Sequence, residues 1–240
     1  MFGPQAQWVL GACDEYQPDA DSGMIIGYHS RLLVEELLRL EPEIFRLIVT
    51  NPSADLEYRK LDFDKVTILP IQNWEFNTIA PVDVVLGFDI LDRCSDLDHL
   101  IGNIDKILKP GGLFLANTIL ISGFDLQVLW DRARSIYPPE RLNLLSVEGL
   151  TTLFERHGFK ALEFSTPGSF DVRSVQNAIR EAPDADWPRF IRYIIEKKHE
   201  NVLDAFQTFL QTHRLSSYGR IVMQKPLNPG TKITTKRNGS

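Results

Sequence analysis

Cysteine is scarce in this chain of 240 residues, which contains only Cys13 and Cys94 and no CxxC pair. Two isolated cysteines support neither a disulfide framework nor a cysteine zinc site, so a reducing cytoplasm is the simplest compartment. The histidines also lack the spacing of metal ligands, since His157, His199 and His213 have no suitably placed partner. We therefore predict a cytoplasmic protein that binds no metal.

Long apolar runs are missing as well. No stretch approaches the roughly 18 apolar residues of a membrane-spanning helix. The first residues do not combine a basic region with an apolar stretch, as a secretion signal does. These absences predict a soluble chain that is not exported and has no membrane partner.

Positive charge is not in excess. The chain has 26 lysines and arginines against 32 aspartates and glutamates, a formal net charge of −6. A protein that binds nucleic acid normally presents a basic face, so DNA and RNA are poor candidates for a partner. Residues 231–240 carry three positive charges but no apolar period, which is typical of a frayed tail.

The chain does contain a regular alternation of strand-like and helix-like segments. Such alternation is typical of a parallel sheet covered by helices, and a hydrophobic content of 43% is enough for a full core. The expected strands are residues 45–50, 66–71, 82–88, 113–120, 160–165 and 218–224. The expected helices are residues 32–40, 96–108 and 147–157, the last with Ser146 as N-cap and Gly158 as C′ glycine.

This pattern divides the chain into three parts. Residues 1–23 form an N-terminal extension, in which residues 14–23 read as a polar loop. Residues 24–226 form one domain with a helical insertion at about 170–214. Residues 227–240 form a flexible tail.

Residues 82–118 are the most informative stretch. The run VDVVLGF is short, apolar and β-branched, which suits a parallel strand buried on both faces. Apolar residues then recur at helical spacing from Asp96 to Leu108. The turn KPGG, residues 109–112, stops the helix and leads into a second apolar strand, LFLANTIL.

This unit resembles the fourth strand, the following helix and the fifth strand of the class I S-adenosylmethionine-dependent methyltransferases. In that family a DVV strand, an acidic pair shortly after it and an LKPGG turn are neighbours. The resemblance implies an α/β, Rossmann-like methyltransferase fold with a mostly parallel seven-stranded sheet, helices on both faces and a helical insertion before the last strand. It also implies S-adenosylmethionine as the cofactor, bound at the C-terminal ends of the strands.

The C-terminal half carries a narrower resemblance. The runs RLNLLSVEGLTTLFERHGFKALEFSTPGSFDV and FQTFLQTHRLSSYGRIVMQKP are similar to methyltransferases of bacterial sugar and polysaccharide pathways. This resemblance implies a small-molecule acceptor that is polar, such as the hydroxyl of a sugar or nucleotide-sugar.

The cofactor loop departs from the family pattern. Where the family has several glycines, residues 24–31 read MIIGYHSR, so Gly27 stands alone beside the bulky Tyr28 and His29. Glycine is required where backbone approaches a ligand closely. The loop is therefore wider, binds the cofactor differently, or binds none. Gly11 is an alternative origin of the turn, but it leaves too long a connection before the first expected helix.

Other cofactor positions also differ from the family. Asn51 stands where the family has an acidic residue that binds the ribose hydroxyls, and its amide oxygen can still accept one such bond. Gln72, Asn73 and Trp74 stand where the family binds adenine. Either amide could accept a hydrogen bond from the adenine amine. Trp74 could stack on the purine, or it could simply cover the edge of the sheet.

Methyl transfer needs a positioned nucleophile and a base for the hydroxyl proton. The candidate bases are Asp89, Asp92 and His29, although His29 could equally be an ordinary loop residue. Many relatives have a histidine directly after the acidic residue at position 92, and this chain lacks it. Arg141 and Asn143 are candidate substrate contacts, or else a solvated charge and a turn residue.

Two functions remain open on the sequence. One is an S-adenosylmethionine-dependent methyltransferase for a small polar acceptor. The other is a degenerate methyltransferase-like domain that does not bind the cofactor and serves as a partner or regulatory module. Apolar residues at helical spacing in 170–214 exceed the needs of one surface helix, so the insertion forms either a lid over the substrate or a homodimer contact. The lid is favoured, because the family resemblance continues through FQTFLQTHRLSS.

Overall fold

The structure is a computed structural model, and it describes residues 3–27, 30–41, 46–50, 66–69, 76, 79–136 and 140–227. Its strands form one seven-stranded sheet with the order β3-β2-β1-β4-β5-β7-β6. The strands are β1 Ser22–Gly27, β2 Arg46–Thr50, β3 Val66–Leu69, β4 Val82–Phe88, β5 Leu108–Ile119, β6 Lys160–Ser165 and β7 Tyr218–Gln224.

The central strand of this sheet is β4, as expected, and all seven of its residues are buried. Its neighbours β1 and β5 run parallel to it, and β2 and β3 continue the parallel part. In contrast, β7 runs antiparallel to both β5 and β6, so the sheet is mixed. The Rossmann-like α/β fold predicted from the sequence is confirmed, with the antiparallel strand next to one edge.

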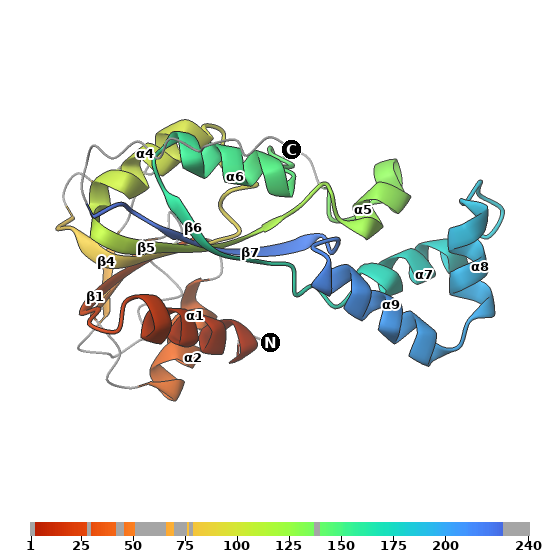
Figure 1. Cartoon of the computed structure of the whole chain (residues 1–240), viewed down its shortest axis with the longest axis horizontal. Helices are drawn as coiled ribbons and strands as arrows, with labels where there is room; N and C mark the ends of the chain where they lie inside the picture. The colour runs from red at the N-terminus through yellow and green to blue at the C-terminus, as the bar shows by residue number, and fades with distance from the viewer. Residues whose placement is uncertain are drawn as a thin grey trace, which may run out of the picture.

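Helices cover both faces of the sheet and extend beyond one end of it. They are α1 Gly3–Tyr16, α2 Ser30–Leu40, α4 Leu97–Ile107, α5 Phe124–Leu129, α6 Val147–Arg156, α7 Asp171–Glu181, α8 Arg189–Lys197 and α9 Glu200–Thr212, with a 3-10 turn η1 at Trp130–Arg132. Figure 1 shows α1 and α2 on one face and α4 and α6 on the other. It also shows α5 and α7–α9 together beyond the end of the sheet at which the parallel strands terminate.

Capping residues account for the bounds of two helices. The carboxylate of Asp96, directly before α4, accepts a hydrogen bond from the backbone N–H of His99 at 2.9 Å. The hydroxyl of Ser146, directly before α6, accepts one from the N–H of Gly149 at 3.0 Å. Gly158 then ends the α6 region with a φ of 83°, a conformation that favours glycine. The Ser146 cap and the Gly158 terminator are as predicted.

The turn expected at residues 109–112 is instead part of a strand, which corrects the sequence prediction. The helix α4 ends at Ile107, and β5 begins at Leu108 without an intervening loop. Gly111 has a φ of 81° and lies where the register between β4 and β5 shifts, between the pairs Val82–Leu108 and Val84–Leu113. A Cβ atom on Gly112 would lie 2.8 Å from the carbonyl oxygen of Asp83. Gly112 therefore permits a close approach between β5 and β4.

The N-terminal segment is more regular than the sequence predicts. A polar loop was expected at residues 14–23, but α1 continues to Tyr16 and β1 begins at Ser22. Ala6 and Val9 of α1 are fully buried in one cluster with α2 and the sheet. Three of the four buried residues of α1 are the small Ala6, Ala12 and Cys13, which give only a faint apolar period and explain the error.

The expected helical insertion between β6 and β7 consists of α7, α8 and α9. These helices share a hydrophobic cluster with α5, separate from the two clusters that flank the sheet. Part of the insertion stays uncovered, because Phe190, Tyr193 and Phe209 are 67%, 52% and 47% exposed. Within the described ranges, no helix combines the length and apolar character needed to cross a membrane.

Candidate functional site

The carboxyl ends of β1 and β4 meet at one edge of the sheet. Gly27, the last residue of β1, pairs in register with Phe88, the last residue of β4. The strand order reverses between these two strands. In open α/β sheets, ligands bind outside the carboxyl ends of the strands at such a reversal. Gly27 presents no side chain at this edge, and Asp89 directly follows β4, so a ligand bound here would lie next to Asp89.

Asp89 is held in an uncommon backbone conformation by a neighbouring strand. Its φ is 52°, in the left-handed region that few residues other than glycine adopt. Its backbone N–H donates to Oδ1 of Asn117 on β5 at 2.8 Å, and Nδ2 of Asn117 donates to the hydroxyl of Tyr218 on β7 at 2.8 Å. Asn117 is buried, so both of its bonds are sheltered from water. Three adjacent strands thus fix the position of Asp89.

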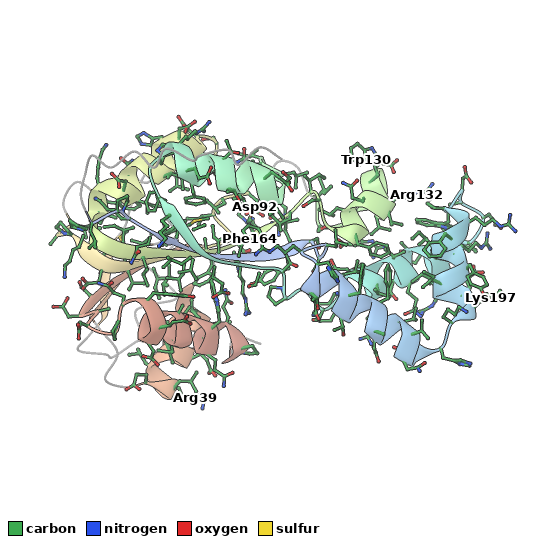
Figure 2. All side chains as sticks on the ribbon, viewed as in Figure 1. Arg39, Asp92, Trp130, Arg132, Phe164 and Lys197 are labelled. Carbon is green, nitrogen blue, oxygen red and sulfur yellow. The ribbon has the colours of Figure 1, made fainter. Side chains whose placement is uncertain are left out.

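Arg141 interacts with both carboxylates that the sequence marks as candidate bases, through an ion pair with Asp92 and through the charge of Asp89. Its guanidinium forms an ion pair with Asp92, whose side chain is completely buried. Burial lowers the pKa of Arg141, and the negative charge of Asp89 partly offsets this effect. Figure 2 shows Asp92 between α6 and the sheet. Asp89 is only half-buried. Of the two carboxylates, Asp89 is therefore the one that an acceptor can reach.

Leu142 and Asn143 form hydrogen bonds with the loop that follows β4. The backbone N–H groups of Leu142 and Asn143 donate to the carbonyl oxygen of Asp92 at 2.6 and 3.1 Å. The side-chain amide of Asn143 donates to the carbonyl oxygens of Leu91 and Cys94 at 3.1 and 2.5 Å. The described contacts of Asn143 are thus with the loop. Its predicted role as a substrate contact, and that of Arg141, stay predictions.

Six of the predicted site residues lie outside the described residues. They are the cofactor candidates Tyr28, Asn51, Gln72, Asn73 and Trp74, and the candidate base His29. Their roles stay predictions. The structure brings together Gly27, Asp89, Asp92, Arg141 and Asn143 around the carboxyl end of β4.

Sequence reasoning missed Asn117 and Tyr218. One signal could have identified Asn117, because it interrupts the apolar run LFLA near the end of an otherwise buried strand. A polar side chain in that position needs a partner, and the residue after β4 is the nearest strand end. Tyr218 gave no comparable signal. Among the described residues, no group of three or more His, Cys, Asp or Glu side chains is placed to hold a metal.

Known proteins resemble this chain in sequence and in fold. A family model described as a methyltransferase domain matches residues 24–163, more than half of the chain. A probable S-adenosylmethionine-dependent methyltransferase of Mycolicibacterium smegmatis is 29% identical over 113 residues, which cover 43% of this chain and 44% of that protein. The chain thus spans less than half the length of this curated relative. It belongs to the methyltransferase-domain family, so the methyltransferase resemblance of residues 82–118 is confirmed, while the narrower resemblance to sugar-pathway methyltransferases stays a prediction.

Solved structures share the fold at low sequence identity. A candidate sarcosine dimethylglycine methyltransferase from Galdieria sulphuraria has a TM-score of 0.59 at 12% identity, covering 93% of this chain and 86% of that chain. The [4+2]-cyclase SpnF has a TM-score of 0.58 at 14% identity, covering 93% and 81%. An O-methyltransferase of Brevibacillus brevis, in complex with S-adenosyl-L-homocysteine, has a TM-score of 0.57 at 14% identity, covering 92% and 72%. At such identities these likenesses establish the fold alone.

Proposed function

We propose that this chain is an S-adenosylmethionine-dependent methyltransferase that acts on a small polar acceptor. The observation that carries the proposal is the placement of Asp89. It directly follows the central strand, it is fixed by Asn117, and it adjoins the strand end at Gly27. The match of the methyltransferase-domain family over residues 24–163 covers this same edge.

Among the residues proposed to contact the cofactor, the structure describes Gly27, which fits a ligand at the end of β1. Gly27 leaves this strand end without a Cβ atom, which suits close approach of a ligand to the backbone. Asn51 is the proposed ribose contact, and Gln72, Asn73 and Trp74 are the proposed adenine contacts, on the sequence resemblance alone. When bound, S-adenosylmethionine supplies an activated methyl group, so the protein mainly has to position the acceptor.

Asp89 is the proposed general base. With the cofactor bound, the acceptor oxygen would take the methyl group in exchange for the sulfur leaving group, and the hydroxyl proton would become acidic. The half-buried carboxylate of Asp89 accepts that proton. Asp92 is buried against Arg141, so we infer that it orients the loop and Arg141 instead.

The finer assignments rest on the sequence. Similarity of the C-terminal half to sugar-pathway methyltransferases favours a sugar or nucleotide-sugar hydroxyl as acceptor. The exposed Phe190, Tyr193 and Phe209 are compatible with a homodimer contact through the insertion. The scarcity of cysteine favours the cytoplasm.

Calorimetric titration of the full chain with S-adenosylmethionine, and separately with S-adenosylhomocysteine, tests the proposal without knowledge of the acceptor. We expect binding heat and a rise in melting temperature with both compounds. Saturating cofactor that produces neither would favour the degenerate module.

A matched pair of variants separates the roles of the two carboxylates. Asp89→Asn should leave cofactor affinity unchanged and lower turnover by about 100-fold, the usual effect of losing a general base. Turnover is measured as S-adenosylhomocysteine released with a panel of sugars and nucleotide-sugars. Asp92→Asn should instead lower the free energy of unfolding by about 3 kcal/mol, because it leaves Arg141 without its buried partner. Equal loss of turnover without loss of stability in both variants would contradict this division of roles.

A further inference from the structure

A cavity of about 410 Å³ lies between α5 and α7, in the helical part of the molecule. This volume is within the range of small-molecule sites. Leu129, Ala178 and Ala182 form an apolar wall, and charged and polar side chains form the remainder. Neither Asp89 nor Arg141 lines the cavity, which is therefore distinct from the site at the strand ends.

The buried wall of the cavity carries Asp125, whose neighbour Asp171 lies outside the lining. Asp125 is 7% exposed and accepts a hydrogen bond from the N–H of Leu126 at 2.9 Å. Asp171, 2% exposed, is its neighbour and accepts from the N–H of Ser217 and from Gln207, both at 2.7 Å. Within the described part of the chain, no ion pair is recorded for either carboxyl. Asp171 also accepts a hydrogen bond from the hydroxyl of Ser216 at 2.7 Å, so its charge is well compensated. Asp125 has fewer such bonds, and a cationic ligand in the cavity can stabilise its charge.

The protonation of Asp125 supports a cationic partner. Burial raises the pKa of Asp125 to about 6, the hydroxyl of Ser217 lowers it, and the charge of Asp171 raises it further. The neighbouring carboxyl of Asp171 therefore opposes ionisation of Asp125. A protonated amine in the cavity would relieve this repulsion.

The exposed rim of the cavity carries two arginines, one in an ion pair and one stacked on a tryptophan ring. Arg134 forms an ion pair with Glu181 at 2.7 Å, so its charge is already balanced. Arg132 has its guanidinium 5.1 Å from the ring centroid of Trp187, and the described contacts give it no carboxylate partner. Figure 2 shows Arg132 on the side of α5 that faces α7 and α8. Stacking fixes the plane of the guanidinium and leaves its edge N–H groups able to bind an acid.

We propose that the cavity between α5 and α7 binds a small molecule that carries both a protonated amine and an acid group. The amine pairs with Asp125 at the buried wall, the acid pairs with Arg132 at the rim, and a short apolar body lies against Leu129. Free amino acids with apolar side chains have this chemistry. The proposal is independent of methyl transfer, because none of its contacts belongs to the edge at Gly27.

Saturation-transfer NMR on the full chain tests the ligand class. The probes are leucine, methionine and phenylalanine, together with isoamylamine and isocaproate, which keep the leucine body but carry one charge each. We expect at least one amino acid to bind, and both single-charge analogues to bind about tenfold more weakly or worse than leucine. Adding S-adenosylhomocysteine should not displace the amino acid. Failure of all three amino acids to bind, or displacement by S-adenosylhomocysteine, overturns the proposal.

Variants of the lining residues test the two contacts. Asp125→Asn and Arg132→Met should each weaken amino-acid binding by about tenfold or more. Arg134→Met is the control on the same rim and should change binding by less than about threefold, because Arg134 is already paired. Melting curves establish that each variant is folded. Equal losses in Arg132→Met and Arg134→Met would overturn the assignment of the acid group to Arg132.

Discussion

A Cβ atom at position 123 would lie 2.3 Å from the Cα of Ser217. Gly123 leads into α5, and Ser217 directly precedes β7, so this contact joins two chain segments at the base of the helical part. We predict that Gly123→Ala lowers the free energy of unfolding by about 2 to 3 kcal/mol, because backbone atoms must move apart. Urea denaturation measures the change.

The control for this prediction is Gly102→Ala in α4. A Cβ atom there would meet nothing within 4 Å. Alanine is the better helix former, so this variant should be more stable by about 0.5 to 1 kcal/mol. Opposite signs for the two variants are the expected result. A Gly123→Ala protein as stable as the wild type would show that the two segments can separate freely.

The second prediction concerns the support of Asp89. Asn117→Ala leaves the N–H of Asp89 without its acceptor in a left-handed conformation. We expect a loss of about 1 to 3 kcal/mol in stability. Turnover should also fall, with cofactor affinity retained. Tyr218→Phe is the control, because it removes only the second bond of Asn117 and should cost about 1 kcal/mol. Similar effects of both variants on turnover would contradict a specific role of Asn117 at Asp89.

The third prediction concerns stability in acid and involves Asp83, near the amino end of the central strand β4. Asp83 accepts hydrogen bonds from the hydroxyl of Ser22 at 2.7 Å, from Lys109 at 2.9 Å and from the N–H of Asp21 at 3.1 Å. Burial alone would raise the pKa of Asp83, but these bonds outweigh it and lower the pKa to about 2. The carboxylate of Asp83 is thus protonated less readily in the folded state than in the unfolded chain.

This stabilisation is complete above the unfolded pKa of about 4 and is lost as the pH falls through about 2. Asp83→Asn should therefore cost about 1 kcal/mol at pH 7, since Lys109 is partly exposed and its interaction is screened. The difference from wild type should disappear near pH 2. Denaturation curves across this range measure it, with the exposed Asp19→Asn as control. A difference that does not change with pH would contradict the assignment.

The fourth prediction has the opposite sign. Because the pKa of Asp125 is raised to about 6, mainly by burial, the folded state holds a proton that the unfolded chain releases near pH 4. Stability contributed by this proton is present at low pH and declines as the pH rises through 6. Asp125→Asn cannot ionise, so it should be more stable than wild type by on the order of 2 kcal/mol at pH 8, and by little at pH 4.

Thermal melts at both pH values check this fourth prediction. Asp131→Asn, at an exposed position in η1, is the control and should show no such dependence on pH. A destabilised Asp125→Asn at pH 8 would mean that the ionised carboxyl is needed for the packing of α5.

The sheet was predictable where apolar runs have clear ends. The bounds of β4, β6 and β7 agree with the sequence prediction, because each is a short run bordered by polar or turn residues. Two elements were not predictable. Burial of α1 depends on small residues that give no strong apolar period. The short helix α5 is stabilised by tertiary packing against α7.

The candidate site was predictable only in part. Asp89 and Asp92 could be predicted as candidate bases, because they come shortly after a buried strand. The sequence does not reveal that Asp92 is buried in an ion pair while Asp89 is accessible. The partner Arg141 is about 50 residues away in the sequence and is brought close by the loop that precedes α6. The support from Asn117 depends likewise on strand register, which residue spacing within one segment cannot reveal.

The ends of the helical insertion lie side by side on neighbouring strands, where Ser165 of β6 pairs with Arg220 of β7. A chain that leaves and re-enters the sheet at one place can be lengthened at small entropic cost, because loop closure depends only weakly on length. The insertion between these points can thus vary in length, provided that its apolar residues still cover α5, while the strand edge that carries Asp89 stays intact. In such an arrangement, the cavity proposed as an amino-acid site can change in sequence without changing the chemistry at the sheet.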